Sequence, residues 1–295
     1  MKRLWVLWGV VSLALLGCSG GHSPEVAVQD SSVGATGAGS PAIALPEEQP
    51  PQGRLVAAPV ATATLRAKFV YGGDPPPREK IDGSKDPFCG ELEILSEKLV
   101  IGPDKGIKNL ALYLDVRRTD AEIPESALKA PPATVELDNN RCVFVPHVLK
   151  VRPGQTIRVK NSDGTGHNAN FSFFNNQSVN FLIPAGGSKD LEVTAEEPAP
   201  IPVDCNIHPW MKAYVIVTEH PYVGITDEHG VLEIADLPVG EVTFKIWHES
   251  SDGSIDEGTV NGKKERWSRG RMEVELKPGV NDLGTIVLAP EMFSK

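Results

Sequence analysis

Short runs of β-branched, aromatic and aliphatic residues recur along the chain from residue 62 onward. The first two, TLRAKFVYGG and IKNLALYLDV, are bounded by Gly, Pro and Asp, which commonly end strands. Others follow at short intervals: TVEL, HVLKV, TIRVKN, NFSFF, KDLEVTA, AYVIVTE, GVLEIADL, EVTFKIWH, RMEVELK and GTIVLAP. No stretch has a long helical apolar period with convincing caps. The pattern predicts an all-β protein of sandwiches or barrels, with little helix.

The segment before these strands, residues 18–61, has a different composition. After Cys18 it reads SGGHSPEVAVQDSSVGATGAGSPAIALPEEQPPQGRLVAAPVA, which is rich in Gly, Ser, Ala and Pro and has no aromatic residue. Such a composition cannot bury enough apolar surface to order itself. We therefore predict a flexible tether, in which His22 is a bystander.

The first residues, MKRLWVLWGVVSLALLGC, have the pattern of an export signal. Lys2 and Arg3 precede an uncharged apolar run, residues 4–16, which suits a signal peptide and is too short to span a bilayer. The run ends in Leu-Leu-Gly-Cys, which resembles the lipobox of bacterial lipoproteins. The resemblance implies a signal peptide at residues 1–17 and a lipid on Cys18 that anchors a periplasmic or cell-surface protein to a membrane. An ordinary secretory signal with an incidental cysteine is the alternative.

The charge of the chain bears on its partners. The formal net charge is −10 at pH 7, and removal of Lys2 and Arg3 with the signal peptide would leave −12. A protein this acidic is a poor candidate for binding nucleic acid, and it would not bind anionic lipid through charge. We therefore expect no nucleic-acid partner, and contact with a membrane only through the lipid.

The cysteine count indicates a thiol with a special role. With Cys18 lipidated, three cysteines remain in an oxidising compartment, and an odd number leaves one unpaired. We expect a disulfide between Cys89 and Cys142, which would leave Cys205 free to act as a metal thiolate. The count alone leaves the two other pairings open.

The last third of the chain has a repeating turn and strand pattern, GITDEHGVLEIADLPVGEVTFKIWHE. It resembles the carboxypeptidase-regulatory or transthyretin-like β-sandwich, a small Ig-like fold, although Leu232 stands where an aromatic residue is commoner. The strands near residues 65–77 and 107–114 fit the opening of such a sandwich. We therefore expect one accessory sandwich from residues 62–130 and 220–290, with a second domain, 131–219, inserted into it. Two consecutive domains divided near Glu219 are the simpler alternative.

The middle segment carries two motifs that occur together in one family. FVPHVLKVRPGQTIRVKNSDGTGHN contains an F-x-P start, a V-x-x-G-x-T-I-x-V-x-N strand pair and a final His-Asn. The second motif, CNIHPWM at 205–211, leads into the strand KAYVIV. Together they resemble the plastocyanin and amicyanin cupredoxins, and the short C-x2-H-x2-M loop looks most like amicyanin. Departures are Ala213 and Tyr214 where a Gly is common, and Val203 where an aromatic residue is common.

The cupredoxin resemblance implies a Greek-key β-sandwich that holds one type 1 copper ion. By resemblance, His167, Cys205 and His208 are the equatorial ligands and Met211 is the weak axial ligand. Nitrogen donors suit Cu(II) and soft sulfur donors suit Cu(I), so this set lets copper cycle between the two states. Asn168 is then expected to tie the upstream ligand strand to the cysteine loop and to hydrogen-bond near the sulfur.

The resemblance also implies a function. We expect an exported electron carrier rather than an enzyme, with a redox partner such as a c-type cytochrome. His208 is expected to expose its ring edge as the electron exit, and Pro209 and Trp210 to form an apolar docking rim. Simple packing of Trp210 beneath the loop is equally compatible with the sequence. The chain has no G-x-S-x-G, HExxH, P-loop or dinucleotide motif that would indicate catalysis.

Other interpretations remain open at this point. Zinc could bind Cys205, His208 and His167, although Met is a poor zinc ligand. The cluster could also be a degenerate site that only packs. Copper delivery would use the same ligands without redox turnover, and a surface scaffold or adhesion protein would need no metal.

The remaining histidines give weaker signals. His147 lies in the predicted strand PHVLKV, where a partly buried structural histidine is a better interpretation than a second metal ligand. His220, His229 and His248 lie near turns or strand ends, where histidine is ordinary.

Overall fold

The computed structural model describes residues 61–251 and 254–293. The signal peptide, the lipidation of Cys18 and the tether up to residue 60 are predictions that lie outside the described residues. Within the described part, no helix is both long and apolar enough to cross a membrane.

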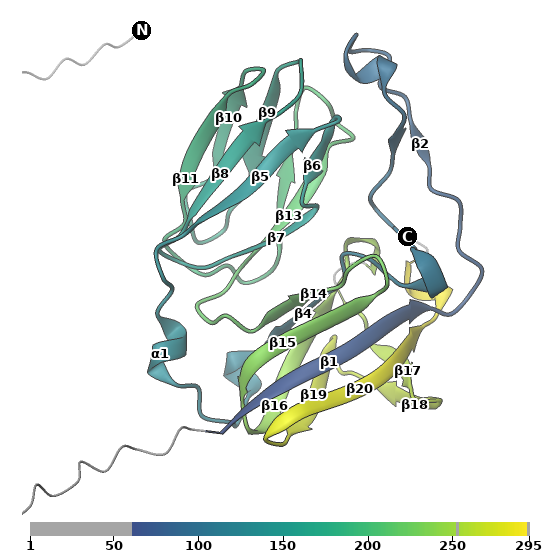
Figure 1. Cartoon of the computed structure of the whole chain (residues 1–295), viewed down its shortest axis with the longest axis vertical. Coiled ribbons are helices and arrows are strands. Elements are labelled where there is room, and N and C mark those ends of the chain that lie inside the picture. The colour runs from purple at the N-terminus through teal and green to yellow at the C-terminus, as the bar shows by residue number, and fades with distance from the viewer. Residues whose placement is uncertain (1–60, 252–253, 294–295) are drawn as a thin grey trace, which may run out of the picture. The chain divides into compact units, whose positions relative to one another are not determined.

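Strands dominate the described residues, so the prediction of an all-β chain is confirmed. The only α-helix among them is the short α1 (Glu125–Leu128) (Figure 1). Single 3-10 turns lie at Cys89–Glu91, Pro103–Lys105, Val116–Arg118, Glu249–Ser251 and Pro290–Phe293. The strands are β1 (Thr62–Tyr71), β2 (Lys80–Ile81), β3 (Ile94–Leu95), β4 (Ala111–Leu114), β5 (Thr134–Asn140), β6 (Val143–Val145), β7 (Val148–Val151), β8 (Thr156–Asn161), β9 (His167–Phe171), β10 (Val179–Ile183), β11 (Ser188–Glu192), β12 (Ile201–Asp204), β13 (Lys212–Val217), β14 (Val223–Ile225), β15 (Val231–Pro238), β16 (Gly240–Trp247), β17 (Glu257–Val260), β18 (Lys263–Arg266), β19 (Arg271–Leu276) and β20 (Gly279–Leu288).

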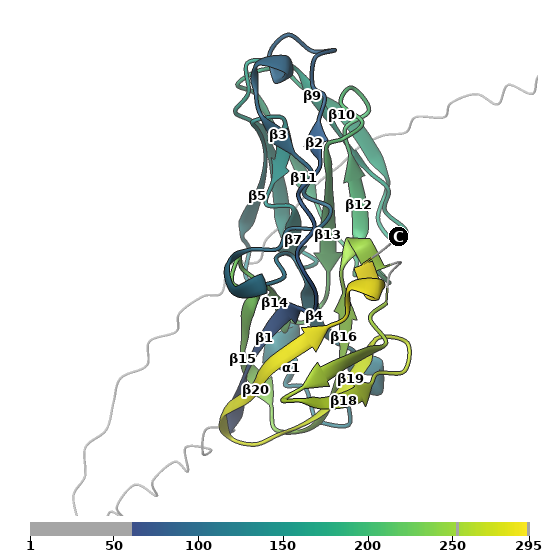
Figure 2. The same ribbon diagram turned by 90° about the vertical axis from the view of Figure 1, so that its right-hand side faces the viewer.

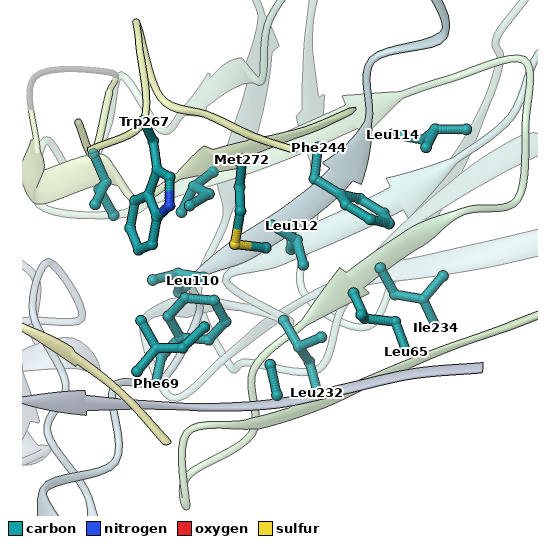
Figure 3. Packing of buried hydrophobic residues seen from close by; sticks show 14 of the residues in the cluster. Leu65, Phe69, Leu110, Leu112, Leu114, Leu232, Ile234, Phe244, Trp267 and Met272 are labelled. Atoms are coloured by element: carbon teal, nitrogen blue, oxygen red, sulfur yellow. The ribbon is translucent and has the colours of Figure 1, made fainter. Parts of the chain in front are cut away.

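One pair of sheets is built from both ends of the described chain. Its sheets have the strand orders β15-β1-β20-β17-β18 and β14-β4-β16-β19. Along β1 every second side chain, from Ala63 to Tyr71, is buried, because successive side chains of a strand point to opposite faces. Figure 3 shows side chains of the two sheets meeting in this core, with Leu65 and Leu232 from one and Leu112 and Phe244 from the other.

A second pair of sheets uses only strands β5 to β13. The sheets have the orders β10-β9-β12-β13-β7 and β11-β8-β5-β6, and within them β5 is parallel to β8 and β13 to β7. Its core contains Leu137, Phe144, Ile157, Phe171 and Val215, all almost fully buried. In the register of this second sandwich, Asp204 at the end of β12 lies opposite Asn170 of β9. This pairing brings the end of β12 to the beginning of β9.

Residues 78–98, here called the strap, leave the first sandwich after β1 and pack on the second. Sequence analysis places them in the range assigned to the accessory sandwich, yet Cys89 and Ile94 are buried in the core of the second one. The strap contains the small antiparallel pair β2 and β3, visible beside the second sandwich in Figure 2. A disulfide joins Cys89 to Cys142, which lies between β5 and β6. The strap is therefore held covalently to the second sandwich.

Candidate metal site

The second sandwich brings the two predicted ligand motifs together. His167 is the first residue of β9, and Cys205 follows the last residue of β12, the neighbouring antiparallel strand. If the pairing of Asp204 with Asn170 is continued by a few residues, the loop that follows β12 lies beside His167. Residues far apart in the sequence therefore meet at one end of the sandwich because these two strands are hydrogen-bonded.

Three of the predicted donor groups converge there. The Nδ1 atoms of His167 and His208 lie 2.8 Å apart, and the Cys205 Sγ lies 3.8 Å from the His208 Nδ1. The donor atoms of all three residues lie within 4.8 Å of one another. Cys205 is a free cysteine, so its sulfur is available as a thiolate. The two other close groups of donors in the described chain each include a sulfur of the Cys89–Cys142 disulfide, which cannot act as a thiolate ligand.

Backbone hydrogen bonds close the loop that carries the cysteine. The Cys205 N–H donates to the Met211 carbonyl at 3.1 Å, and the Met211 N–H donates to the His208 carbonyl at 2.8 Å. Met211 is buried in the same core as Cys205. The C-x2-H-x2-M spacing therefore makes a compact turn in which all three side chains project from one short segment.

Asn168 connects β9 to this loop. Its Oδ1 accepts a hydrogen bond from the Ile207 N–H at 3.2 Å and lies 3.4 Å from the Cys205 sulfur, which donates as a thiol. Its Nδ2 donates to the side-chain oxygens of Asn180 and Asn206. The side chain is buried and fully engaged, so it fixes the loop relative to the strand that carries His167.

Two carboxylates that sequence analysis missed lie behind the histidines. Asp163 Oδ2 lies 2.9 Å from the His167 Nε2, and Asp86 Oδ2 lies 3.3 Å from the His208 Nε2. Asp163 stands four residues before His167, and this short spacing could have indicated from the sequence that the carboxylate lies near the imidazole. Asp86 belongs to the strap, and nothing in the local sequence places it near the loop of residues 205–211.

These carboxylates determine where the imidazole protons reside. A carboxylate beside an Nε2 favours the proton on that nitrogen, which leaves a lone pair on Nδ1. The Nδ1 atoms of His167 and His208 then face each other at 2.8 Å, where a shared proton joins them in the metal-free protein, and they lie close to the Cys205 sulfur, a further acceptor once it is deprotonated. An ion bonded to two nitrogens at ~2.0–2.1 Å holds them roughly 3.3 Å apart at a tetrahedral angle. A small opening of the histidine pair admits such a cation, so the donor set fits a metal ion.

The acidity of nearby groups is consistent with this arrangement. Burial acts to raise the pKa of Asp86, but hydrogen bonds from the Cys89 N–H, the Thr165 hydroxyl and His208 outweigh it and hold the pKa at about 2. The pKa of His167 is lowered, first by burial and then by the neighbouring His208. An anionic Asp86 and a neutral His167 are the states that metal binding requires.

The expectation of an exposed His208 ring edge is wrong for this structure. His208 is only 2% exposed, because the strap covers it and places Asp86 against its outer nitrogen. Trp210 is partly buried, with its ring 5.1 Å from that of His208 and its indole N–H donating to the Cys142 carbonyl at 3.1 Å. Pro209 is exposed, so of the predicted docking rim it alone lies open to solvent.

The other histidines lie elsewhere. His147 is buried between Glu249 and Glu97, whose oxygens lie 3.2 and 3.5 Å from its ring nitrogens on opposite sides. Burial lowers the pKa of His147, but the two carboxylates outweigh it and raise the pKa to about 9. Burial lowers the pKa of His220 and of His248 to about 4, so both are neutral structural histidines. None of the three contributes to the donor cluster.

Comparison with known proteins gives limited information. No family model matches the chain, and no curated protein matches it. Among solved structures, a copper-containing nitrite reductase from Thermus scotoductus SA-01 is 21% identical over 30% of this chain, with a TM-score of 0.27, and the chain spans only 23% of that enzyme. An amicyanin variant in the Cu(I) state is 18% identical over 29% of this chain and 82% of its own length, with a TM-score of 0.27. A purple cupredoxin from Nitrosopumilus maritimus is 20% identical over 28% of this chain and 98% of its own, with a TM-score of 0.24. Scores this low carry no argument, and the assignment of a site rests on the geometry above.

Proposed function

We propose that this chain binds one copper ion in a cupredoxin-type site of the second sandwich and serves as an electron carrier. His167, Cys205 and His208 would hold the ion, with the thioether of Met211 as a weaker ligand. Copper at such a site supplies one-electron chemistry between Cu(II) and Cu(I). The proposal is supported by the convergence of two imidazole nitrogens and one thiol sulfur within 4.8 Å, next to a buried Met.

The donor types favour copper over zinc. Structural zinc sites use four strong ligands from Cys, His or carboxylate, whereas the fourth group available here is a thioether. Two imidazoles and one thiolate with a weak thioether form the ligand set of blue-copper electron-transfer sites. Zinc therefore remains the less suitable ion for this cluster.

Burial is the observation that favours electron transfer over copper delivery. His167, Cys205, His208 and Met211 are each at most 2% exposed. Copper delivery requires that a ligand of the acceptor protein reach the ion, and the burial of these four side chains hinders such contact. An electron can leave without any ligand entering. A buried site with few open positions also offers a substrate little access to the ion, so we propose a carrier and not an enzyme.

The setting of this function is part of the proposal. We take residues 131–219 as an inserted cupredoxin-like domain and the flanking sheets as an accessory sandwich of transthyretin-like type, in line with the strand pairing. The lipobox-like start would anchor the protein to a membrane after export. The partner would be a redox protein such as a c-type cytochrome, which would approach near the exposed Ile207 and Pro209 rather than the covered His208.

A copper titration of the full chain tests the proposal. Visible absorption and EPR are recorded as Cu(II) is added to wild type, Cys205→Ala and His208→Ala, with His229→Ala as a control because that histidine is exposed. We expect one copper per chain and an intense blue charge-transfer band that only Cys205→Ala and His208→Ala lose. A colourless protein that takes up no stoichiometric copper after reduction and reconstitution would contradict the proposal. Copper that binds but passes readily to a chelator would favour delivery.

A further inference from the structure

The strap contributes a group to the candidate copper site from outside the sheets that carry the ligands. Asp86 lies in the strap, whereas His167, Cys205 and His208 belong to β9 and the loop between β12 and β13. Its Oδ2 lies 3.3 Å from the His208 Nε2 and accepts the Thr165 hydroxyl at 2.9 Å. His208 has no other carboxylate at its outer nitrogen within the described residues.

We propose that Asp86 is a positioning residue for the copper: it orients the His208 imidazole, so that strap and copper site form one functional unit. This inference rests on the proposed function and goes beyond it, because it makes metal binding depend on a segment outside the ligand-bearing sandwich. Carboxylates that accept the second N–H of a ligand histidine fix its tautomer and ring orientation. Asp163 does so for His167. Asp86 Oδ2 lies 3.3 Å from the buried His208 Nε2, which makes no aligned hydrogen bond in this structure, and we assign Asp86 the same role.

The two oxygens of Asp86 have separate tasks. Oδ1 accepts the backbone N–H groups of Phe88 and Cys89, both at 2.9 Å, and so holds the carboxylate in the turn at the tip of the strap. Oδ2 faces His208 and Thr165. Because the first oxygen is tied to the backbone, the second has a defined direction toward the imidazole.

The disulfide aligns both histidine-facing carboxylates. Cys89 donates its N–H to Asp86, and Cys142, the other half of the disulfide, donates its N–H to Asp163 at 2.8 Å. The carboxylate behind each ligand histidine is therefore held by the backbone of one half-cystine. This symmetry links the position of the strap to the geometry of both imidazoles.

The strap also fits closely against the loop before His167. A Cβ added at Gly164 would lie 3.0 Å from the ring of Phe88, whereas one added at Gly166 would meet nothing within 4 Å. A Cβ at Gly164 must therefore push the Phe88 ring by a few tenths of an ångström, and one at Gly166 need not. The pair provides a way to press on the strap without altering any carboxylate.

The test uses the full chain with Asp86→Asn and the control Asp82→Asn. The asparagine Oδ1 can still accept the Phe88 and Cys89 N–H groups, but its NH₂ would face His208 with a donor where an acceptor stood. Asp82 is an exposed carboxylate of the same strap that accepts the Ser84 N–H, a bond that asparagine keeps. We expect Asp86→Asn to lower copper affinity roughly 10- to 100-fold, the range for partners of ligand histidines, and Asp82→Asn to leave it unchanged.

A second readout needs no copper. Nitrogen-15 NMR of the histidine rings in the metal-free wild type should show the His208 proton on Nε2. In Asp86→Asn the Nε2 proton should be lost for His208 and kept for His167. A wild-type His208 with no proton on Nε2, or one unaffected by Asp86→Asn, would overturn the inference. If the asparagine variant does not fold, Gly164→Ala, which presses on the Phe88 ring two residues from Asp86, should lower the fraction of His208 that carries the Nε2 proton relative to Gly166→Ala.

These outcomes separate the inference from the proposed function. Failure of wild type to bind copper would overturn the function, while the NMR result would still decide whether Asp86 orients His208. Normal copper binding by Asp86→Asn, equal to that of Asp82→Asn, would overturn the inference and leave the electron-carrier function standing.

Discussion

His167 and His208 face each other with their Nδ1 atoms 2.8 Å apart. Each has a carboxylate at its opposite nitrogen, Asp163 for the first and Asp86 for the second. Two imidazoles held in this way offer lone pairs to the same small space, where a proton or a metal ion can satisfy both. The two histidines come from separate segments, His167 from β9 and His208 from the loop between β12 and β13.

Asn168 should stabilise the metal-free protein. Asn168→Ala removes the buried amide that contacts the Ile207 N–H and the Asn206 side chain, and we expect the free energy of unfolding to fall by about 1–3 kcal/mol. Urea denaturation measures the change. Asn170→Ala on the same strand is the matched control, since the Asn170 side chain makes no hydrogen bond within the described residues. Equal losses in both variants would show that Asn168 has no special role.

The disulfide should contribute strongly to stability. Cys89 and Cys142 are separated by 53 residues, and closing a loop of that length stabilises the folded state by about 4 kcal/mol in the chain-entropy account. The disulfide also holds the turn between β5 and β6. Arg141 and Cys142 of this turn both have positive φ, a backbone conformation that is unfavourable for non-glycine residues. We expect Cys89→Ala/Cys142→Ala to unfold at clearly lower denaturant concentration. An unchanged midpoint would contradict this.

Alkaline pH should weaken the contacts of His147. Its pKa is raised to about 9 between Glu97 and Glu249, above the ordinary value of 6.5. The folded state therefore binds the proton more tightly than the unfolded state, and this stabilisation is complete below pH 6.5 and disappears as the pH rises through 9. The melting temperature of wild type should fall between pH 7 and 10, and this fall should be smaller in His147→Gln. The exposed His229→Gln should behave like wild type, and identical slopes in all three would refute the prediction.

Acid should destabilise the protein through two other histidines. Burial lowers the pKa of His220 and His248 to about 4, so the unfolded state binds protons that the folded state does not. Stability is then lost as the pH falls from 6.5 toward 4, by roughly 3 kcal/mol per histidine over the whole window. Unfolding free energies of wild type and His248→Gln measure this. A variant with the same acid slope as wild type would show that His248 does not contribute.

Much of the ligand cluster could be expected from the sequence because it depends on local patterns. Alternating apolar positions predicted the strands, and β12 and β9 then bring the C-x2-H-x2-M loop to His167 through ordinary sheet pairing. Loop spacing alone places Cys205, His208 and Met211 on one turn. To predict these features, one needs to know only a few residues on either side of each position.

The covering of the site could not be predicted in this way. Asp86 reaches His208 because a distant segment is fastened by a disulfide, and neither the path of that segment nor its partner is encoded near the loop of residues 205–211. The resemblance to cupredoxins led to the expectation that His208 exposes its ring edge, and that expectation took no account of the strap. Tertiary contacts between remote segments decided the burial of this residue, and a local pattern carries no information about them.

X-ray absorption at the copper edge of the copper-loaded full chain tests the central claim most directly, with Cys205→Ser measured alongside. The account predicts one sulfur and two nitrogen neighbours at bonding distance in wild type, and loss of the short copper–sulfur contact in the variant. Copper surrounded only by nitrogen and oxygen in wild type, or a spectrum unchanged by Cys205→Ser, would contradict the account.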